Sequence, residues 1–182
     1  FKAVAAAGGL PLCIYNNPST TNFIFSPDLI ARLSQVPHIA GVKMPLPGNG
    51  DFAGELANLR SRTPEGFVIG YSGDWGAKDS LLAGGDTWFS VVAGLLPVPA
   101  LRLTRAAASG NTQKATQIDE AFSALWALFK EFGSFRVMYA LANLLDGSRI
   151  EPMRPVQPLT SDVRLKVQAA LDAFHESIAS LE

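Results

Sequence analysis

The residue with the clearest chemical potential is Lys43, which ends a short apolar run. Residues 39–42 (IAGV) are partly β-branched and Pro45 and Pro47 follow, so the run is predicted to be a buried strand ending at the lysine. Burial disfavours the charged form of a lysine and lowers its pKa, which frees a neutral amine to attack a carbonyl and form a Schiff base. The alternative for a lone lysine is a structural role, with its ammonium group reaching solvent at the rim.

Candidate groups also lie at the ends of the other predicted strands. Tyr15 ends the strand before the lysine strand, so its phenol could approach the Schiff-base carbon and move protons as the carbinolamine forms and as a carbon–carbon bond breaks. Ser72 and Gly73 follow the third strand, and Gly73 would let a small keto acid approach the backbone closely. Phe89 lies in the fourth strand. Singly, each has a simpler explanation as a rim aromatic, a turn or a packing residue, so only their joint placement indicates a site.

These groups need a fold that brings strand ends together, and the chain repeats a strand–helix pattern four times. Strands are predicted at residues 12–15, 39–42, 67–71 and 87–92. Such repeats call for parallel strands with right-handed crossovers, in an open doubly wound sheet or a (β/α)₈ barrel. A dinucleotide-binding sheet would carry a G-x-G-x-x-G motif after its first strand, and none is present. A barrel needs eight units, of which the sequence supplies four.

The C-terminal part of the sequence is predicted to be helical. Apolar residues recur at helical spacing from residue 111 or 112 onward, and a final amphipathic helix follows the proline-rich connector 151–158. We therefore expect a partial barrel at 1–109 and a helical region at 110–182. The sequence starts within a predicted helix and without methionine, so we expect a fragment, a processed product or an incompletely built chain.

Composition argues against several classes of function. With 182 residues, 48% hydrophobic and 17% charged, the chain has the make-up of a globular domain. A net charge of -1 without a basic cluster argues against a nucleic-acid partner, and no long apolar segment or signal peptide indicates a membrane or export, so we expect the cytoplasm. Two histidines and the single Cys13 have no metal-ligand spacing, and Cys13 is expected to be a small core residue.

Four motifs resemble those of the dihydrodipicolinate synthase and N-acetylneuraminate lyase family. They are YNNPSTT at 15–21, GVK at 41–43, SGD at 72–74 and GGDTWFSVV at 84–92. Their order and spacing agree over nearly the whole chain. The resemblance implies an α/β fold, the C-terminal half of a (β/α)₈ TIM barrel with four parallel βα units followed by a helical extension. It also implies a class I, pyruvate-dependent lyase that is commonly a homotetramer and uses no cofactor beyond its Schiff base.

The resemblance also assigns roles to individual residues. Lys43 matches the Schiff-base lysine and Tyr15 the catalytic tyrosine, while Gly73 and Phe89 match positions that line the pyruvate site, with Ser72 beside them. Dihydrodipicolinate synthases usually carry an arginine for the aldehyde's carboxylate where this sequence has Thr20. A hydroxyl cannot make the bidentate pair of an arginine, so an aldolase for a sugar acid or another 2-keto acid, or a dehydratase, is at least as well supported as the synthase.

We therefore expect a Schiff-base-forming lyase or aldolase that acts on pyruvate or a related 2-keto acid and an aldehyde, as a dimer or tetramer. The family's Gly-Thr-Thr loop and its intersubunit tyrosine match no residue here, so the chain alone is expected to be inactive. The alternative is a non-catalytic half-barrel that serves as a structural or assembly piece. Lys43 and Tyr15 together favour the enzyme, because a purely structural piece has no need of a lysine at the end of an apolar strand.

Overall fold

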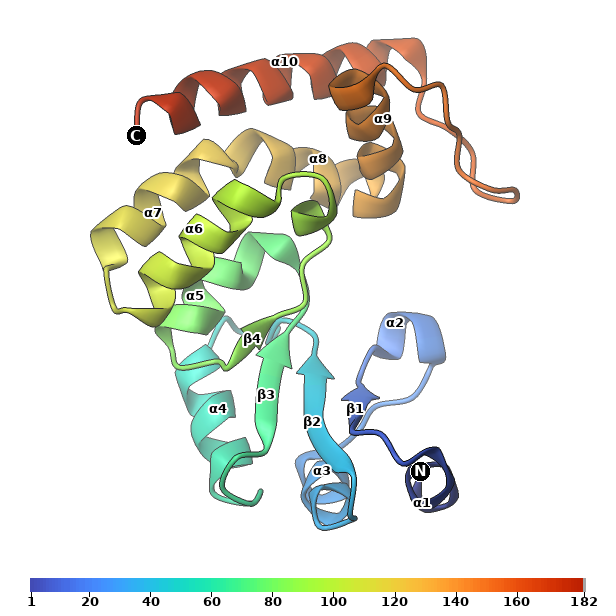
Figure 1. The fold of residues 1–182 in the computed structure, drawn as a ribbon, viewed down its shortest axis with the longest axis vertical. Coiled ribbons are helices and arrows are strands. Elements are labelled where there is room, and N and C mark those ends of the chain that lie inside the picture. Colours follow the sequence, from blue (N-terminus) through green and yellow to red (C-terminus); the bar gives the residue numbers. More distant parts are fainter. Residues whose placement is uncertain (182) are drawn as a thin grey trace. The chain divides into compact units, whose positions relative to one another are not determined.

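The computed structural model describes residues 1–181, which form two compact units, one of Phe1–Phe89 and one from Ser90 onward (Figure 1). The first unit is built on a parallel four-stranded sheet with the strand order β1-β2-β3-β4. The strands are β1 (Leu12–Tyr15), β2 (Ile39–Met44), β3 (Val68–Tyr71) and β4 (Thr87–Trp88). The structure thus confirms the predicted α/β arrangement of four parallel strands.

The helices of the first unit begin where the sequence supplies caps. Ser26 accepts a hydrogen bond from the Leu29 amide at 3.2 Å, and Asp51 accepts one from the Gly54 amide at 2.8 Å. These residues start the helices that begin at Pro27 and Phe52. The helical elements are α1 (Lys2–Gly8), α2 (Pro18–Thr21), α3 (Pro27–Ser34), α4 (Phe52–Arg60), the 3₁₀ turn η1 (Asp74–Gly76) and α5 (Ala77–Leu82).

The two faces of the sheet have different surroundings. Because side chains alternate along a strand, Ile14, Val42 and Ile69 share one face, and all three are fully buried. They belong to the core that also includes side chains of α3 and α4. The opposite face carries Tyr15, which is 44% exposed, and the half-buried Lys43. The second face is therefore the more accessible one, and it holds the chemically interesting side chains.

Two details differ from the sequence-based expectations. Cys13 was expected in the core but is exposed, because it alternates with buried Ile14 and lies on the accessible face. The fourth strand was expected to reach residue 92 but ends at Trp88. The Ser90 hydroxyl accepts a hydrogen bond from the Ala93 amide at 3.0 Å, which begins a turn that leads into η2 (Val92–Gly94).

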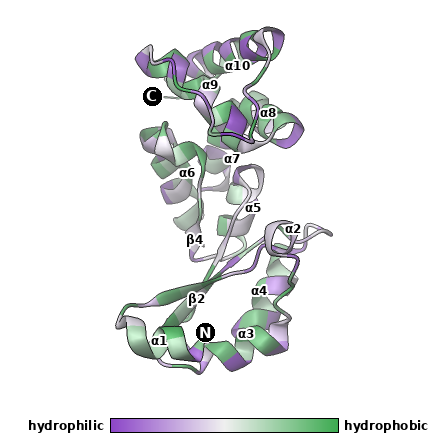
Figure 2. Ribbon diagram, turned by 90° about the vertical axis from the view of Figure 1, so that its right-hand side faces the viewer, coloured by the Kyte–Doolittle hydropathy of each residue, from purple (hydrophilic) through white to green (hydrophobic). Residues whose placement is uncertain are grey.

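The second unit is helical, as predicted. Its helices are α6 (Pro97–Ala108), α7 (Thr112–Ala121), α8 (Ser123–Phe132), α9 (Ser134–Asp146) and α10 (Ser161–Ala179). Phe122 packs on Trp126 and Phe174, with ring centroids 4.7 and 4.6 Å apart, so the aromatic stripe forms core. Figure 2 shows hydrophilic and hydrophobic residues alternating along α10, as expected for an amphipathic helix. Among the described residues, none of the helices combines the length and the apolar composition of a membrane-spanning segment. The expected boundary between the partial barrel and the helical region, at residues 109 and 110, stays a prediction.

Candidate active site

The pairing of β1 with β2 brings the two principal candidates together. Leu12 pairs with Ile39, but the register then slips by one residue, so that Cys13 pairs with Gly41 and Tyr15 with Lys43. Without the slip Tyr15 would pair with Val42, whose side chain points into the core on the other face. The irregularity in this short strand pair therefore places the phenol and the amine on one face.

Lys43 lies between two aromatic rings. Its Nζ atom is 5.0 Å from the centroid of the Tyr15 ring and 5.5 Å from that of Phe89. Contacts of this length hold a lysine nitrogen against the ring faces and partly shield it from water. Phe89 follows β4 directly. Its amide donates to the Tyr71 carbonyl at 2.9 Å, and this bond holds the Phe89 backbone beside β3. Three predicted site residues thus form one cluster, which we call the lysine cluster: Tyr15, Lys43 and Phe89.

The lysine cluster depends on Gly70, a residue that was not predicted to belong to the site. Gly70 pairs with Lys43 on one side and Thr87 on the other. A Cβ atom at position 70 would lie 2.6 Å from the Thr87 carbonyl oxygen and 2.8 Å from the Phe89 ring. Glycine therefore creates the space that the Phe89 ring occupies beside the lysine. An isolated glycine within an apolar strand was the available signal, because it often marks a close approach.

The substitution Gly70→Ala tests this packing. We expect a loss of about 1–3 kcal/mol in the free energy of unfolding, because the methyl group meets a backbone oxygen that can move only with its strand. Urea unfolding measures the loss. Gly48→Ala is the matched control, since a Cβ atom there meets nothing within 4 Å, and it should change stability by less than about 0.5 kcal/mol. Equal effects of the two substitutions would contradict the packing role.

The remaining predicted site residues lie around the ends of the neighbouring strands. The Ser72 hydroxyl donates to the Met44 carbonyl at 3.1 Å, which links the ends of β3 and β2. Gly73 has a φ of 88°, a left-handed conformation that favours glycine, and a Cβ atom there would lie 2.9 Å from the Leu46 side chain. Thr20 is exposed in α2. These three residues take no part in the ring contacts of the lysine cluster, which join Lys43 to Tyr15 and Phe89.

Buried polar side chains hold the loops around the lysine cluster. Asn16 is 4% exposed, and its amide oxygen accepts from the Phe25 amide at 3.2 Å, which ties the end of β1 to the loop that follows α2. Asp74 is 1% exposed and accepts a hydrogen bond from the Trp88 indole at 3.0 Å, which joins η1 to β4. Asn16 lies in the YNNPSTT motif and Asp74 in the SGD motif, but neither was predicted to have a role of its own. Their positions within YNNP and SGD were the available signal.

Cys13 lies on the same face as the lysine cluster, where a thiolate could compete as the nucleophile. Desolvation raises the pKa of its thiol, while the Lys43 backbone and charge act in the opposite direction. A thiol with a raised pKa is a weak nucleophile at neutral pH, because the thiolate is the reactive form. Cys13 is therefore expected to be present mostly as the thiol, which makes it a weak nucleophile beside the lysine cluster.

A second titratable pair lies behind the sheet, on the core face. Tyr71 is 1% exposed, and neither its hydroxyl nor Glu55 Oε2 meets the geometry of a hydrogen bond to any described residue. Desolvation raises the pKa of the Glu55 carboxyl, the nearby Tyr71 hydroxyl lowers it and the charge of Asp51 raises it. Desolvation, followed by the nearby Glu55 carboxyl, also raises the pKa of Tyr71. Both groups are therefore favoured in their protonated forms.

The raised pKa of Glu55 predicts a specific pH dependence of stability. The contribution of Glu55 to the free energy of unfolding is fully present below the ordinary glutamate pKa of about 4.3. It is lost as pH rises through the raised pKa of Glu55 in the folded state. The side chain of Glu55→Gln is neutral at every pH, so the variant does not lose this contribution. Its stability advantage over the parent chain should therefore be larger at pH 7 than at pH 4. Thermal unfolding across this range measures the difference, with the exposed Glu65→Gln as control. A stability advantage of Glu55→Gln that becomes smaller towards pH 7 would contradict a raised pKa of Glu55.

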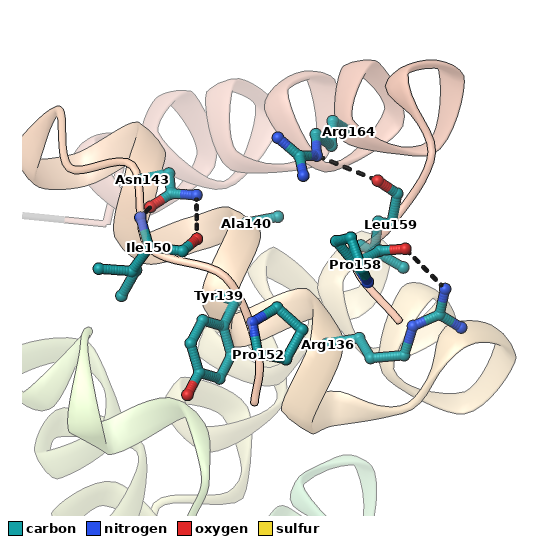
Figure 3. Close-up of a pocket in the computed structure, with 9 residues that line it drawn as sticks. All are labelled: Arg136, Tyr139, Ala140, Asn143, Ile150, Pro152, Pro158, Leu159 and Arg164. Atoms are coloured by element: carbon teal, nitrogen blue, oxygen red, sulfur yellow. Dashed lines mark hydrogen bonds between the residues drawn. The ribbon is translucent and has the colours of Figure 1, made fainter. Parts of the chain in front are cut away.

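A pocket in the second unit is lined by two arginines that bind backbone carbonyls of the same unit (Figure 3). Arg136 donates to the carbonyls of Gln157 and Pro158 at 2.8 and 3.2 Å, and Arg164 donates to that of Leu159 at 3.1 Å. The two guanidinium groups thereby bind the connector that precedes α10. In the described residues no group of three or more His, Cys, Asp or Glu side chains could hold a metal ion.

Comparison with known proteins gives a consistent family match. The model of the dihydrodipicolinate synthetase family matches residues 1–174. The 4-hydroxy-tetrahydrodipicolinate synthase of Neisseria meningitidis serogroup C is 35% identical over 176 residues, and the match covers 95% of this chain and 58% of the relative. The chain thus spans less than two thirds of the length of this curated relative.

Solved structures give the same result for the fold. The dihydrodipicolinate synthase of Agrobacterium tumefaciens is 60% identical with a TM-score of 0.93, and the match covers 95% of this chain and 58% of that chain. The chloride-inhibited dihydrodipicolinate synthase of Acinetobacter baumannii, solved in complex with pyruvate, is 26% identical with a TM-score of 0.82 and coverage of 96% and 58%. These similarities confirm the predicted partial TIM barrel with its helical extension.

Proposed function

This chain belongs to the dihydrodipicolinate synthetase family, and from that premise we propose that it carries the Schiff-base lysine of a class I lyase or aldolase acting on pyruvate or a related 2-keto acid. The observation that supports this most directly is the position of the Lys43 nitrogen, 5.0 Å from the Tyr15 ring centroid on the accessible face of the sheet. A relative that is 26% identical was solved in complex with pyruvate, which supports a 2-keto acid as the first substrate.

In the proposed reaction, the neutral amine of Lys43 attacks the C2 carbonyl of pyruvate and gives a carbinolamine. Loss of the C2 hydroxyl as water then forms the C=N bond. The Tyr15 phenol supplies the proton for this water and can accept one again when a later carbon–carbon bond breaks. Phe89 and Gly73 would form part of the wall around the keto acid, with Ser72 between strand ends. The chemistry needs no cofactor beyond the covalent Schiff base.

The second substrate is proposed to be an aldehyde whose binding does not require an arginine in α2. Thr20 is exposed there and offers one hydroxyl. A hydroxyl can donate one hydrogen bond, whereas an arginine would form a bidentate pair with a carboxylate. This difference favours an aldolase or a dehydratase for a sugar acid or another 2-keto acid at least as much as the named synthase.

Complete turnover is proposed to need more than these 182 residues. The chain covers 58% of the length of its first curated relative, and the sheet face with the lysine cluster is partly exposed. We further propose a homo-oligomer, a dimer or tetramer, located in the cytoplasm. The first chemical step depends on residues within the first unit, so it can be tested on this chain even if turnover is absent.

Borohydride trapping tests the proposed function. The protein is incubated with pyruvate, reduced with sodium borohydride and weighed intact. We expect a mass gain of one reduced pyruvyl group per chain, because only one lysine lies in the lysine cluster. Urea-unfolded protein under the same conditions is the control, and it should gain far less or spread the label over many lysines. A folded chain that gains no mass, or gains the same label as the unfolded chain, would favour a non-catalytic structural role.

A further inference from the structure

A chain of polar side chains leads from α2 to the hydroxyl of Tyr15. The Ser19 hydroxyl donates a hydrogen bond to Asn17 Oδ1 at 2.7 Å, and Asn17 Nδ2 donates one to the Tyr15 oxygen at 2.5 Å. The bond from Ser19 occupies the amide oxygen and directs the NH₂ group of Asn17 towards the phenol. Asn17 is therefore the described side chain that binds the hydroxyl of the proposed catalytic tyrosine.

The position of Asn17 makes this use of its side chain notable. Asn17 is the N-cap residue of α2, where an asparagine side chain ordinarily accepts a hydrogen bond from a helix amide. Here it makes no such bond, and its backbone carbonyl accepts from the Thr20 and Thr21 amides at 3.1 and 2.9 Å. Pro18 at the first helical position has no amide to satisfy. The Asn17 carbonyl thus binds two amides of α2, while the Asn17 side chain binds Tyr15 instead of a helix amide.

An N–H donor at the phenol oxygen has a direct chemical consequence. It stabilises the negative charge that develops on the oxygen as the phenol releases its proton. An amide NH₂ group cannot accept a hydrogen bond, so the phenol's own proton is left for a different acceptor. The Lys43 nitrogen lies on the same face of the sheet, where a carbinolamine hydroxyl would form.

We propose that Asn17 is a positioning residue for Tyr15, which orients the phenol and stabilises its oxygen during dehydration of the carbinolamine. In this step the phenol proton passes to the C2 hydroxyl, the C–O bond breaks and water leaves. The products are a protonated Schiff base on Lys43 and a phenolate, which receives the Asn17 hydrogen bond and later regains a proton from solvent. The inference rests on the proposed Schiff-base function and extends it to a residue outside the lysine cluster.

The test uses the full chain with four variants at position 17 or nearby. Asn17→Asp keeps the shape but replaces the donor by an acceptor with a negative charge, and Asn17→Ala removes the contact. Asn17→Gln retains the donor on a longer side chain. Asn22→Asp is the charge control, because Asn22 is exposed at the end of α2 in a left-handed conformation that aspartate tolerates. The readouts are the rate of borohydride trapping with pyruvate across pH and the ¹³Cζ chemical shift of Tyr15.

We expect Asn17→Asp and Asn17→Ala to slow trapping by about 10–100-fold. Asn17→Asp should also move the maximum of the trapping rate to higher pH. Asn17→Gln should trap faster than Asn17→Ala, and Asn22→Asp should trap at the rate of the parent chain. The Tyr15 shift should change in Asn17→Asp and Asn17→Ala. The role of Asn17 would be overturned if every Asn17 variant kept the trapping rate, the pH profile and the Tyr15 chemical shift of the parent chain. The Schiff-base function would still stand in that case. A parent chain that traps no pyruvate would overturn both, so the two failures are distinguishable.

Discussion

Replacing Lys43 by arginine is expected to reduce pyruvate trapping to the borohydride background. A guanidinium group stays protonated in proteins and has no free electron pair with which to attack a carbonyl, although it keeps the length and charge of the side chain. Lys43→Met removes the charge as well and should give the same loss, because the missing group is the amine itself. Intact-mass analysis after reduction measures the yield of labelled chain in each variant.

The control for Lys43 is a lysine of the same unit outside the lysine cluster. Lys78 lies in α5 and pairs with Asp79 at 3.2 Å. Lys78→Arg should therefore trap pyruvate with the yield of the parent chain. Label that persists in Lys43→Arg and falls in Lys78→Arg would mean that the reactive amine belongs to Lys78 in α5 and not to Lys43 in β2.

Replacing Tyr15 by phenylalanine is expected to slow trapping by about 10²–10⁴-fold, the range typical of losing a general acid or base. The ring that lies 5.0 Å from the Lys43 nitrogen remains, so the packing of the lysine is retained while the hydroxyl is lost. The label should still reach one group per chain at long times, because the amine is unchanged. Samples reduced after increasing times of incubation give the rate.

The matched control for Tyr15 is Tyr139→Phe in α9 of the second unit. It removes a phenol hydroxyl that the proposal does not use, and the trapping rate should stay within about threefold of the parent value. A Tyr15→Phe rate as fast as that of Tyr139→Phe would exclude proton transfer by the Tyr15 hydroxyl. In that case the Tyr15 ring would have only a packing role beside Lys43.

The sequence contained enough information to predict the order of elements and the positions of the main candidates. Apolar runs and capping residues such as Ser26 and Asp51 mark where elements begin, since these are local signals. Parallel strands place their carboxyl ends along one edge, so Tyr15 and Lys43 were expected to be neighbours. The register of the two strands confirms this placement. Their catalytic roles stay predictions.

The details that sequence reasoning missed depend on pairing between distant segments. Four apolar residues do not reveal which face of the strand is covered, so Cys13 was wrongly expected in the core. The one-residue slip between β1 and β2 is a property of the pair and not of either segment. The space made by Gly70 depends on Phe89, which lies far along the chain. The hydrogen bond from Asn17 to Tyr15 joins near neighbours and was missed for a different reason, because it depends on the backbone conformation at the start of α2.

The most direct measurement of the central claim is the location of the trapped pyruvate by peptide mass analysis. Trypsin cleaves after unmodified lysine and arginine, so the parent sequence gives separate peptides 33–43 and 44–60. A reduced pyruvyl group on Lys43 blocks this cleavage. The proposal predicts a single peptide 33–60 that carries one such group, with Lys2, Lys78, Lys114, Lys130 and Lys166 unlabelled. Label on any other lysine, or intact cleavage at Lys43 in folded, pyruvate-treated protein, would contradict it.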